Sequence, residues 1–204
     1  MRFDPVRVSA AQLRALRESR FPLLNPSREE PMRRAVQDAR EALDSVGGII
    51  ECAAVGVDAG IGSPFFSSVE SVASQLLFSI PAVKAVEFGD GMAIAGLRAS
   101  EANDPLCMDG GRVTATSNHN GGVTGGITNG MPVILRVGVK PTPSIAREQQ
   151  TVDVSTGQNA SLSISGRHDP CIVPRAVVVV ESALAVALAE LIMDADAHSP
   201  SDNA

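Results

Sequence analysis

Aromatic residues are scarce in this chain of 204 residues: it has no Trp, no Tyr and six Phe, an aromatic share of 3%. The core must therefore be built from Val, Ile, Leu, Ala and these phenylalanines. Lysine is nearly absent, with Lys84 and Lys140 against fifteen arginines. The formal net charge of −6 disfavours nucleic acid as a partner, because nucleic-acid-binding surfaces are basic.

Cysteine patterning is also lacking. Cys52, Cys107 and Cys171 are odd in number and widely spaced, without a CxxC pair or a Cys/His cluster. This excludes a disulfide framework and predicts no metal site. Reduced thiols are typical of the cytoplasm, and no apolar signal segment follows Met1, so we expect a cytoplasmic protein. The longest apolar stretch, near residues 172–193, contains charged residues and does not predict a membrane span.

The hydrophobic fraction of 44% and the length predict one folded domain over residues 1–204, with a disordered tail at 197–204. Apolar periodicity predicts helices at residues 10–17, 28–46, 64–80 and 174–194. In the second helix Met32, Val36, Ala39 and Leu43 would form the buried face. In the third, Phe65, Val69, Val72, Leu76 and Ile80 would do so, and in the last Val177, Val180, Leu184, Leu188 and Leu191.

Strands are predicted at residues 49–57, 82–88, 112–116 and 132–139, with a hairpin between 151–154 and 161–165 and a polar loop over 99–111. Strands and helices do not alternate strictly. The pattern therefore favours an α+β fold, with an antiparallel sheet packed against long helices.

Three segments contain residues suited to ligand chemistry. Residues 117–130, SNHNGGVTGGITNG, are rich in glycine, which suits either a ligand cradle or a tight structural turn. Residues 140–145, KPTPSI, place a lysine beside two hydroxyls on a proline-stiffened backbone. They suit a bound anion or a rigid surface turn. Residues 166–171, GRHDPC, offer an anion-binding arginine and proton-transfer groups, or an internal ion pair at a helix start.

These segments occur in the order SIPAVKAVEFGDG, SNHNGGVTGGITNG, KPTPSI and GRHDPC, preceded by DSVGG and AGIGSPFF. Together they resemble the C-terminal half of chorismate synthase, over roughly residues 22–195. The resemblance implies elimination of phosphate and a ring hydrogen, in a 1,4 sense, from 5-enolpyruvylshikimate 3-phosphate. It further implies reduced FMN as cofactor, a β-α-β sandwich and a homo-oligomer, typically a tetramer.

The resemblance also implies site residues. Positions matching the family's flavin-binding residues are Pro81, Ala82, Gly125, Lys140, Pro141, Thr142, Pro143, Ser144 and Arg167. Asp169 matches an aspartate proposed to handle a proton near flavin N5, and His168 beside it is a second catalytic candidate. His119 is interpreted as loop structure. We expect Gly125, the 140–144 segment and the 167–169 turn to line one concave face.

The family's N-terminal motifs, GESHG and a HADYT-like sequence, do not occur in this chain. Their histidines are the proposed acids of the reaction. We therefore expect a piece of a longer enzyme, with little activity alone, or a non-catalytic remnant that binds flavin or oligomerises.

Overall fold

A three-stranded antiparallel sheet forms the centre of the computed structural model, which describes residues 2–166 and 168–198. Its strand order is β1 (Gly48–Ala54), β7 (Val133–Val139) and β2 (Val83–Phe88). Gly48 of β1 and Val83 of β2 both pair with Val139, so both outer strands start where β7 ends. β7 is buried at every position but one, as expected for a central strand.

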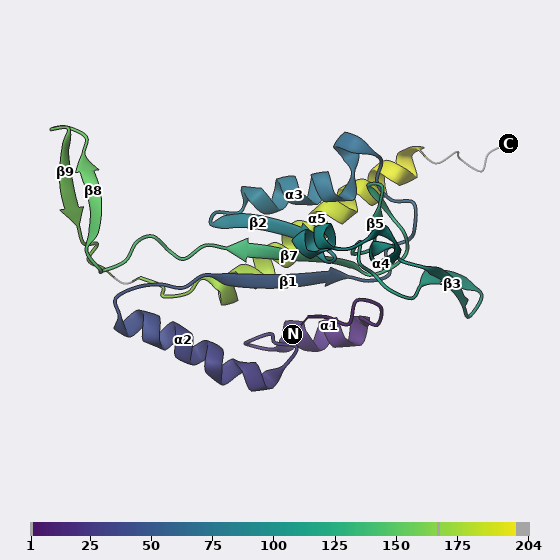
Figure 1. Ribbon diagram of the computed structural model, residues 1–204, viewed down its shortest axis with the longest axis horizontal. Coiled ribbons are helices and arrows are strands. Elements are labelled where there is room, and N and C mark those ends of the chain that lie inside the picture. Colours follow the sequence, from purple (N-terminus) through teal and green to yellow (C-terminus); the bar gives the residue numbers. More distant parts are fainter. Residues whose placement is uncertain (1, 167, 199–204) are drawn as a thin grey trace.

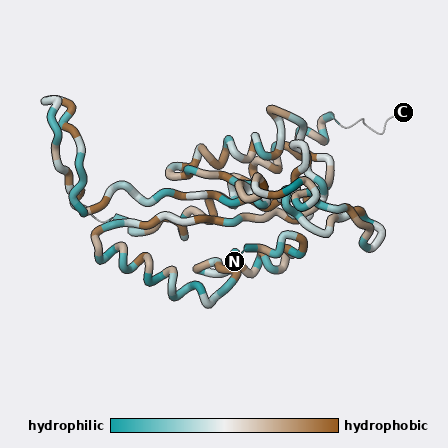
Figure 2. The backbone as a smooth tube through the Cα atoms, viewed as in Figure 1, coloured by the Kyte–Doolittle hydropathy of each residue, from teal (hydrophilic) through white to brown (hydrophobic). Residues whose placement is uncertain are grey.

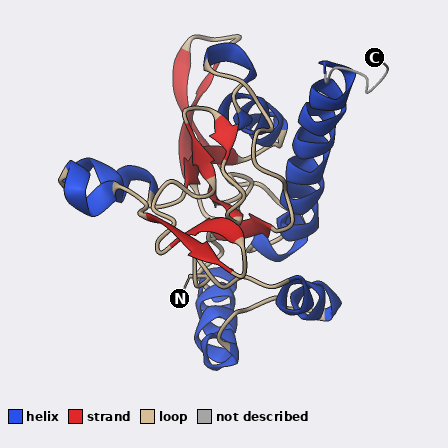
Figure 3. Cartoon of the chain, turned by 90° about the vertical axis from the view of Figure 1, so that its right-hand side faces the viewer, coloured by secondary structure: helices blue, strands red, loops and turns tan. Residues whose placement is uncertain are grey.

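Two helices cover one face of this sheet: α3 (Val69–Ser79) and α5 (Val173–His198) (Figures 1 and 3). Ser68 begins α3 by accepting a hydrogen bond from the Ser71 N–H, a regular N-cap. The core is formed where the sheet-facing side chains of the strands, every second residue, meet the buried stripe of each helix, every third or fourth residue. Its buried members are Ile50, Val69, Ala73, Leu77, Val83, Val123, Val133, Leu135, Val137, Val139, Val180, Leu184, Ala187, Leu188 and Leu191. Four of the five predicted α5 positions are buried, and Val177 is partly buried.

The predicted face of α3 is wrong at its first position. Phe65 is 85% exposed, because residues 65–67 form a separate 3-10 turn, η2 (Phe65–Ser67), before the helix cap at Ser68. Phe66 beside it is 95% exposed.

The predicted buried face of the second helix is only partly correct, because Val36 and Ala39 are partly buried whereas Met32 and Leu43 are exposed. α1 (Ala10–Glu18), η1 (Pro26–Arg28) and α2 (Glu29–Glu41) lie along the outer side of β1 and contain no buried residue. Met32 is 46% exposed, and Figure 2 shows that hydrophilic residues predominate along α2. The helix ends at Glu41 rather than near residue 46, since Leu43 adopts a positive φ of 58°.

Short hairpins complete the fold: β3 (Leu106–Asp109) with β4 (Arg112–Ala115), β5 (Val123–Thr124) with β6 (Ile127–Thr128), and β8 (Gln149–Asp153) with β9 (Gln158–Leu162). The β8–β9 hairpin projects away from the sheet (Figure 1) and turns near Gly157 as predicted, in a different register. Residues 99–111 are not one loop, because they contain α4 (Ala99–Ala102) and β3; η3 (Gly91–Gly96) precedes them. The α+β class is confirmed.

α5 is long and apolar enough to cross a membrane by length and composition alone, and 28% of its most apolar window is buried. Core helices of folded domains meet the same criteria. α5 extends to His198, and residues 199–204 lie outside the described part of the chain.

Candidate functional site

The end of β7 brings together segments that are far apart in sequence. The Lys140 N–H donates a hydrogen bond of 2.9 Å to the carbonyl of Ala82, so the backbone of residues 81–82 lies beside the 140–144 segment. Ala82 has a positive φ of 75°, a conformation that non-glycine residues rarely adopt. Strain of this kind is common where backbone is shaped for a ligand.

The turn between α2 and β1 connects this segment to the GRHDPC loop. The Ser45 hydroxyl donates to the Thr142 carbonyl at 2.6 Å, and the Val46 N–H donates to the Pro170 carbonyl at 2.8 Å. One turn therefore holds two of the predicted site segments. The DSVGG motif, residues 44–48, therefore positions the KPTPSI and GRHDPC segments relative to each other.

A cavity of about 570 Å³ lies where these segments meet, a size that suits a small-molecule ligand. The predicted residues Thr142, Ser144, His168 and Asp169 line it. Sequence reasoning missed two arginines on its wall, Arg40 from α2 and Arg175 from the first turns of α5. An arginine one turn from a helix end carries no sequence signal of its own, so only the fold identifies these two. Pro170 and Ile172 complete the lining.

Thr142 contains one of the few buried polar side-chain atoms that have no hydrogen-bond partner among the described residues. Its hydroxyl oxygen is inaccessible, although the residue lines the cavity. A buried hydroxyl without a partner costs on the order of 1–3 kcal/mol, so such groups are retained where a ligand or water satisfies them. Ser144 and two guanidinium groups are on the same wall, and this donor set suits an anionic ligand such as the phosphate of FMN.

Asp169 and His168 both have defined partners. The Asp169 carboxylate forms an ion pair with Arg175 at 2.5 Å and accepts a hydrogen bond from the Cys171 N–H at 3.2 Å. His168 Nε2 lies 3.2 Å from the Ile164 carbonyl. A carbonyl can only accept, so Nε2 carries the proton in this bond. The two side chains thus present an oriented carboxylate and an imidazole nitrogen at the cavity.

Lys140 is exposed at the end of β7, next to the cavity wall formed by Thr142 and Ser144. Pro141 and Pro143 fix the backbone between them. Arg167 lies outside the described residues.

Gly125 lies elsewhere. It is exposed in the two-residue turn between β5 and β6, with φ of 63° for Gly125 and 89° for Gly126. This turn precedes β7, whereas Lys140 follows it, and seven extended residues span ~20 Å. Figure 1 shows β5 at the opposite end of the sheet from the β8–β9 side, toward which β7 runs. The expectation that Gly125 shares one concave face with the 140–144 segment and with His168 and Asp169 is therefore wrong within a single chain.

The loop at residues 117–120 is held by its own contacts. Asp104 accepts hydrogen bonds from Ser117 Oγ at 2.7 Å, the His119 N–H at 2.7 Å and the Asn120 side chain at 2.8 Å. Burial opposes ionisation of Asp104, but these hydrogen bonds outweigh it and lower the pKa of the carboxyl. His119 Nδ1 contacts Asp90 Oδ2 at 2.6 Å. These contacts support the interpretation of His119 as loop structure.

Across the described residues, no three His, Cys, Asp or Glu side chains are grouped so as to hold a metal ion. The features that remain are an α+β fold and a cavity with arginine, hydroxyl, carboxylate and imidazole groups at the end of its central strand. Groups of these kinds suit a small phosphate- or carboxylate-bearing ligand.

Comparisons with known proteins identify the family. The model of the chorismate synthase family matches residues 5–193. The chorismate synthase of Korarchaeum cryptofilum is 49% identical over 174 residues, 84% of this chain and 48% of that protein. That of Chitinophaga pinensis is 49% identical over 158 residues, 78% of this chain and 47% of that protein. A crystal structure of chorismate synthase superposes with a TM-score of 0.67 at 30% identity, covering 83% of this chain and 44% of that one.

The chain belongs to the chorismate synthase family, a family of lyases, as the ordered motifs predicted. It spans about half the length of the curated relatives that it matches.

Proposed function

We propose that this chain supplies the C-terminal part of a chorismate synthase active site. The 570 Å³ cavity would hold part of the reduced FMN and of 5-enolpyruvylshikimate 3-phosphate. The observation that carries this proposal is the cavity wall itself, where two predicted hydroxyl residues, Thr142 and Ser144, lie with Arg40 and Arg175. Guanidinium and hydroxyl groups on one wall suit an anionic ligand.

The residues divide into binding and proton-handling groups. Lys140, Thr142 and Ser144 would bind the flavin phosphate, and the backbone of residues 81–82 would limit its position. Asp169, oriented by Arg175, and His168, oriented by Ile164, would hold or accept a proton beside the flavin. Gly125 and Arg167 stay predicted flavin contacts through the family match alone.

The reaction removes phosphate and a ring proton from the substrate and forms a new double bond, without net oxidation. Reduced FMN, when bound, would supply electron density as phosphate leaves. The described cavity contains one histidine, His168, whereas the family's proposed acids come from GESHG and HADYT-like motifs. Groups that act as a unit lose most of their effect when one is missing. We therefore expect this chain alone to bind flavin and to turn over little substrate.

Flavin binding tests the site directly. FMN would be titrated into the 204-residue chain under anaerobic reducing conditions and followed by calorimetry. Thr142→Val keeps the shape of the side chain and removes the hydroxyl. It should weaken binding by a factor of about 10 to 150, because a hydrogen bond to a charged group contributes roughly 1.5–3 kcal/mol. Thr151→Val, on the exposed strand β8, is the matched control and should change nothing. Equal affinities for all three proteins would refute the assignment of Thr142.

The activity assay separates an enzyme part from a remnant. Anaerobic incubation with reduced FMN and substrate should yield little chorismate from this chain. Turnover near that of a full-length relative would contradict the absence of essential groups. Flavin binding without turnover, also after addition of a relative's N-terminal half, would favour the alternative, a non-catalytic flavin-binding module.

We also propose that the chain works in the cytoplasm and associates with further copies of itself. α5 exposes Val178 at 62%, Val186 at 57% and Met193 at 71%, and α3 exposes Phe78 at 53%. Apolar surface of this extent favours association. Light scattering should find a dimer or larger oligomer, and a stable monomer at high concentration would contradict the proposal.

A further inference from the structure

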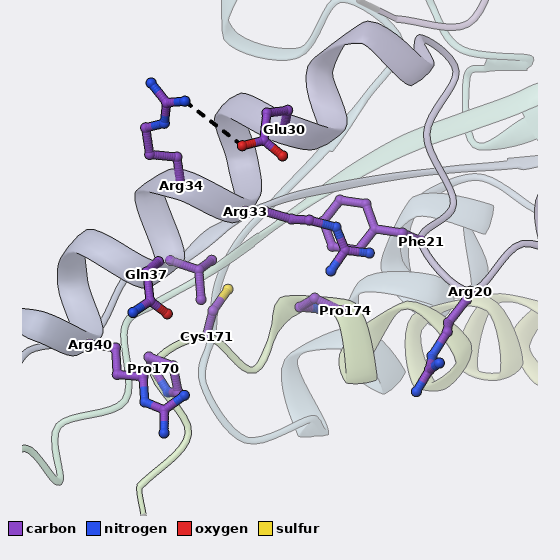
Figure 4. Close-up of a pocket in the computed structure, with 11 residues that line it drawn as sticks. Arg20, Phe21, Glu30, Arg33, Arg34, Gln37, Arg40, Pro170, Cys171 and Pro174 are labelled. Carbon is purple, nitrogen blue, oxygen red and sulfur yellow. Dashed lines mark ion pairs between the residues drawn. The ribbon is translucent and has the colours of Figure 1, made fainter.

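A second cavity, of about 620 Å³, lies on the other side of Pro170. Helix α2, the segment before it and the start of α5 form its walls. In Figure 4, Phe21 and Arg33 lie above the opening, Arg20 lies to one side and Arg40 to the other. Cys171 and Pro174 lie between them.

The contacts of these walls hold the cavity in place. The Arg33 guanidinium lies 4.8 Å from the centre of the Phe21 ring and pairs with Glu29 at 2.6 Å. Arg17 pairs with Glu181 at 2.8 Å, which ties α1 to α5. This exposed ion pair joins the end of α1 to α5, and neither α1 nor α2 contains a fully buried residue.

Positive charge is concentrated here in a chain whose net charge is −6. Four arginines line the cavity, against Glu30 as the single acid. Glu30 pairs with Arg34 at 3.8 Å, and Figure 4 shows Arg34 turned away from the opening. Within residues 2–166 and 168–198, no ion pair is formed by Arg20 or Arg40. Two guanidinium groups thus remain available on opposite sides of the opening.

Apart from Gln37, whose side-chain amide donates to Glu41 at 2.7 Å, the rest of the lining is mainly apolar and partly flat. The Phe21 ring, Val36, Pro170 and Pro174 provide apolar contact, and the volume exceeds what inorganic phosphate alone would fill. Aromatic rings pack well against proline and phenylalanine faces and against stacked guanidinium groups, while arginine binds carboxylate and phosphate in a bidentate manner.

We propose that this second cavity binds an aromatic ring carrying a carboxylate or phosphate group. The ring would lie against Phe21, Pro170 and Pro174, and its anionic group would reach Arg20 or Arg40. This site is separate from the flavin cavity, although Arg40 and Pro170 line both. Because of the shared wall, ligand in one cavity is expected to change affinity in the other.

Phenyl phosphate is the probe, with inorganic phosphate and benzyl alcohol as its two halves. Calorimetry on the full chain should give tighter binding for phenyl phosphate than for either half, by tenfold or more. Arg20→Gln, which alters this cavity alone, should weaken binding at least fivefold, and Phe21→Leu should also weaken it. Arg112→Gln, an exposed arginine on β4, is the matched control and should bind like the parent.

Thr142→Val separates this proposal from the flavin site. Thr142 lines the first cavity and not the second, so this variant should lose FMN affinity and keep phenyl phosphate affinity. A loss of phenyl phosphate binding in Thr142→Val with none in Arg20→Gln would place the probe in the flavin cavity and overturn the inference.

Cys171 gives an independent readout of occupancy. In a Cys107→Ser background, N-ethylmaleimide should label Cys171 more slowly when phenyl phosphate is present, and Arg20→Gln should shift this protection to at least fivefold higher phenyl phosphate concentration. Melting curves would verify that each variant is folded. Absence of phenyl phosphate binding at millimolar concentration, or an unchanged labelling rate at saturation, would refute the site.

Discussion

Gly47 is the position where one added methyl group should disturb the flavin site most directly. A Cβ there would lie 2.2 Å from the Val139 carbonyl oxygen, 3.0 Å from the Lys140 carbonyl carbon and 3.0 Å from Pro141 Cδ. Two of these atoms are backbone at the end of the central strand, so no rotamer change can relieve the overlap. Gly47→Ala must move either the 44–47 turn or the start of the 140–144 segment.

The expected cost follows from two opposing effects. Overpacking costs about 1–3 kcal/mol, and the 2.2 Å approach places this site at the upper end. Replacing glycine by alanine returns about 0.4–1 kcal/mol by restricting the unfolded chain. The net loss in free energy of unfolding is therefore ~2 kcal/mol, a fall of roughly 4–8 °C in melting temperature for a chain of this length.

Gly96→Ala is the matched control, because a Cβ at Gly96 meets no atom within 4 Å and its φ is not in the left-handed region. Thermal melts followed by circular dichroism would compare the two variants with the parent. FMN affinity should fall in Gly47→Ala and not in Gly96→Ala. If both variants melt and bind flavin alike, the close approach at Gly47 does not position the site.

Three further predictions concern the core and its buried groups. The hydrogen bond from Arg136, at 2.8 Å, lowers the pKa of Glu87 in the folded protein. The stabilisation by this pair is therefore fully present above the ordinary glutamate pKa of about 4.3, and it is lost as pH falls through the lower pKa of the folded state. Glu87→Gln should therefore flatten the acid side of the stability profile, and an unchanged profile would contradict the pairing. Burial, aided by Glu181, raises the pKa of Cys52 to about 12, so this thiol should resist alkylation at pH 8 until the protein is denatured; rapid labelling of the native protein would refute this. Leu184→Ala, at a position 2% exposed, should cost about 2–5 kcal/mol in chemical denaturation, whereas Val186→Ala, 57% exposed, should cost little.

Local sequence was sufficient for the main elements. Periodicity identified the sheet-facing stripe of α5, because a helix that packs on a sheet must bury one side. The start of α1 rests on local chemistry as well, since the Ser9 side chain accepts a hydrogen bond from the Gln12 N–H. The order of several motifs identified the family, since agreement of spaced segments is far more specific than any one of them.

Local sequence failed where a side chain's environment depends on distant chain. Met32 has helical spacing for a buried face but is exposed, and Leu43 lies beyond the end of α2 at a positive φ. Phe65 fits the periodicity of α3 but precedes its cap. Apolar periodicity shows which residues can be buried together, and the tertiary arrangement determines whether a partner surface is present.

The candidate site shows the same division. The sequence by itself determined which residues have binding chemistry, since Thr142, Ser144, His168 and Asp169 lie in recognisable segments. Only the tertiary structure brought Arg40 and Arg175 onto the same wall and separated Gly125 from Lys140 by the length of β7. The physical reason is that the functional groups a residue offers for binding are fixed by its type and its sequence neighbours. Distance between segments is set by strand pairing and helix packing, which join parts of the chain that sequence spacing does not relate.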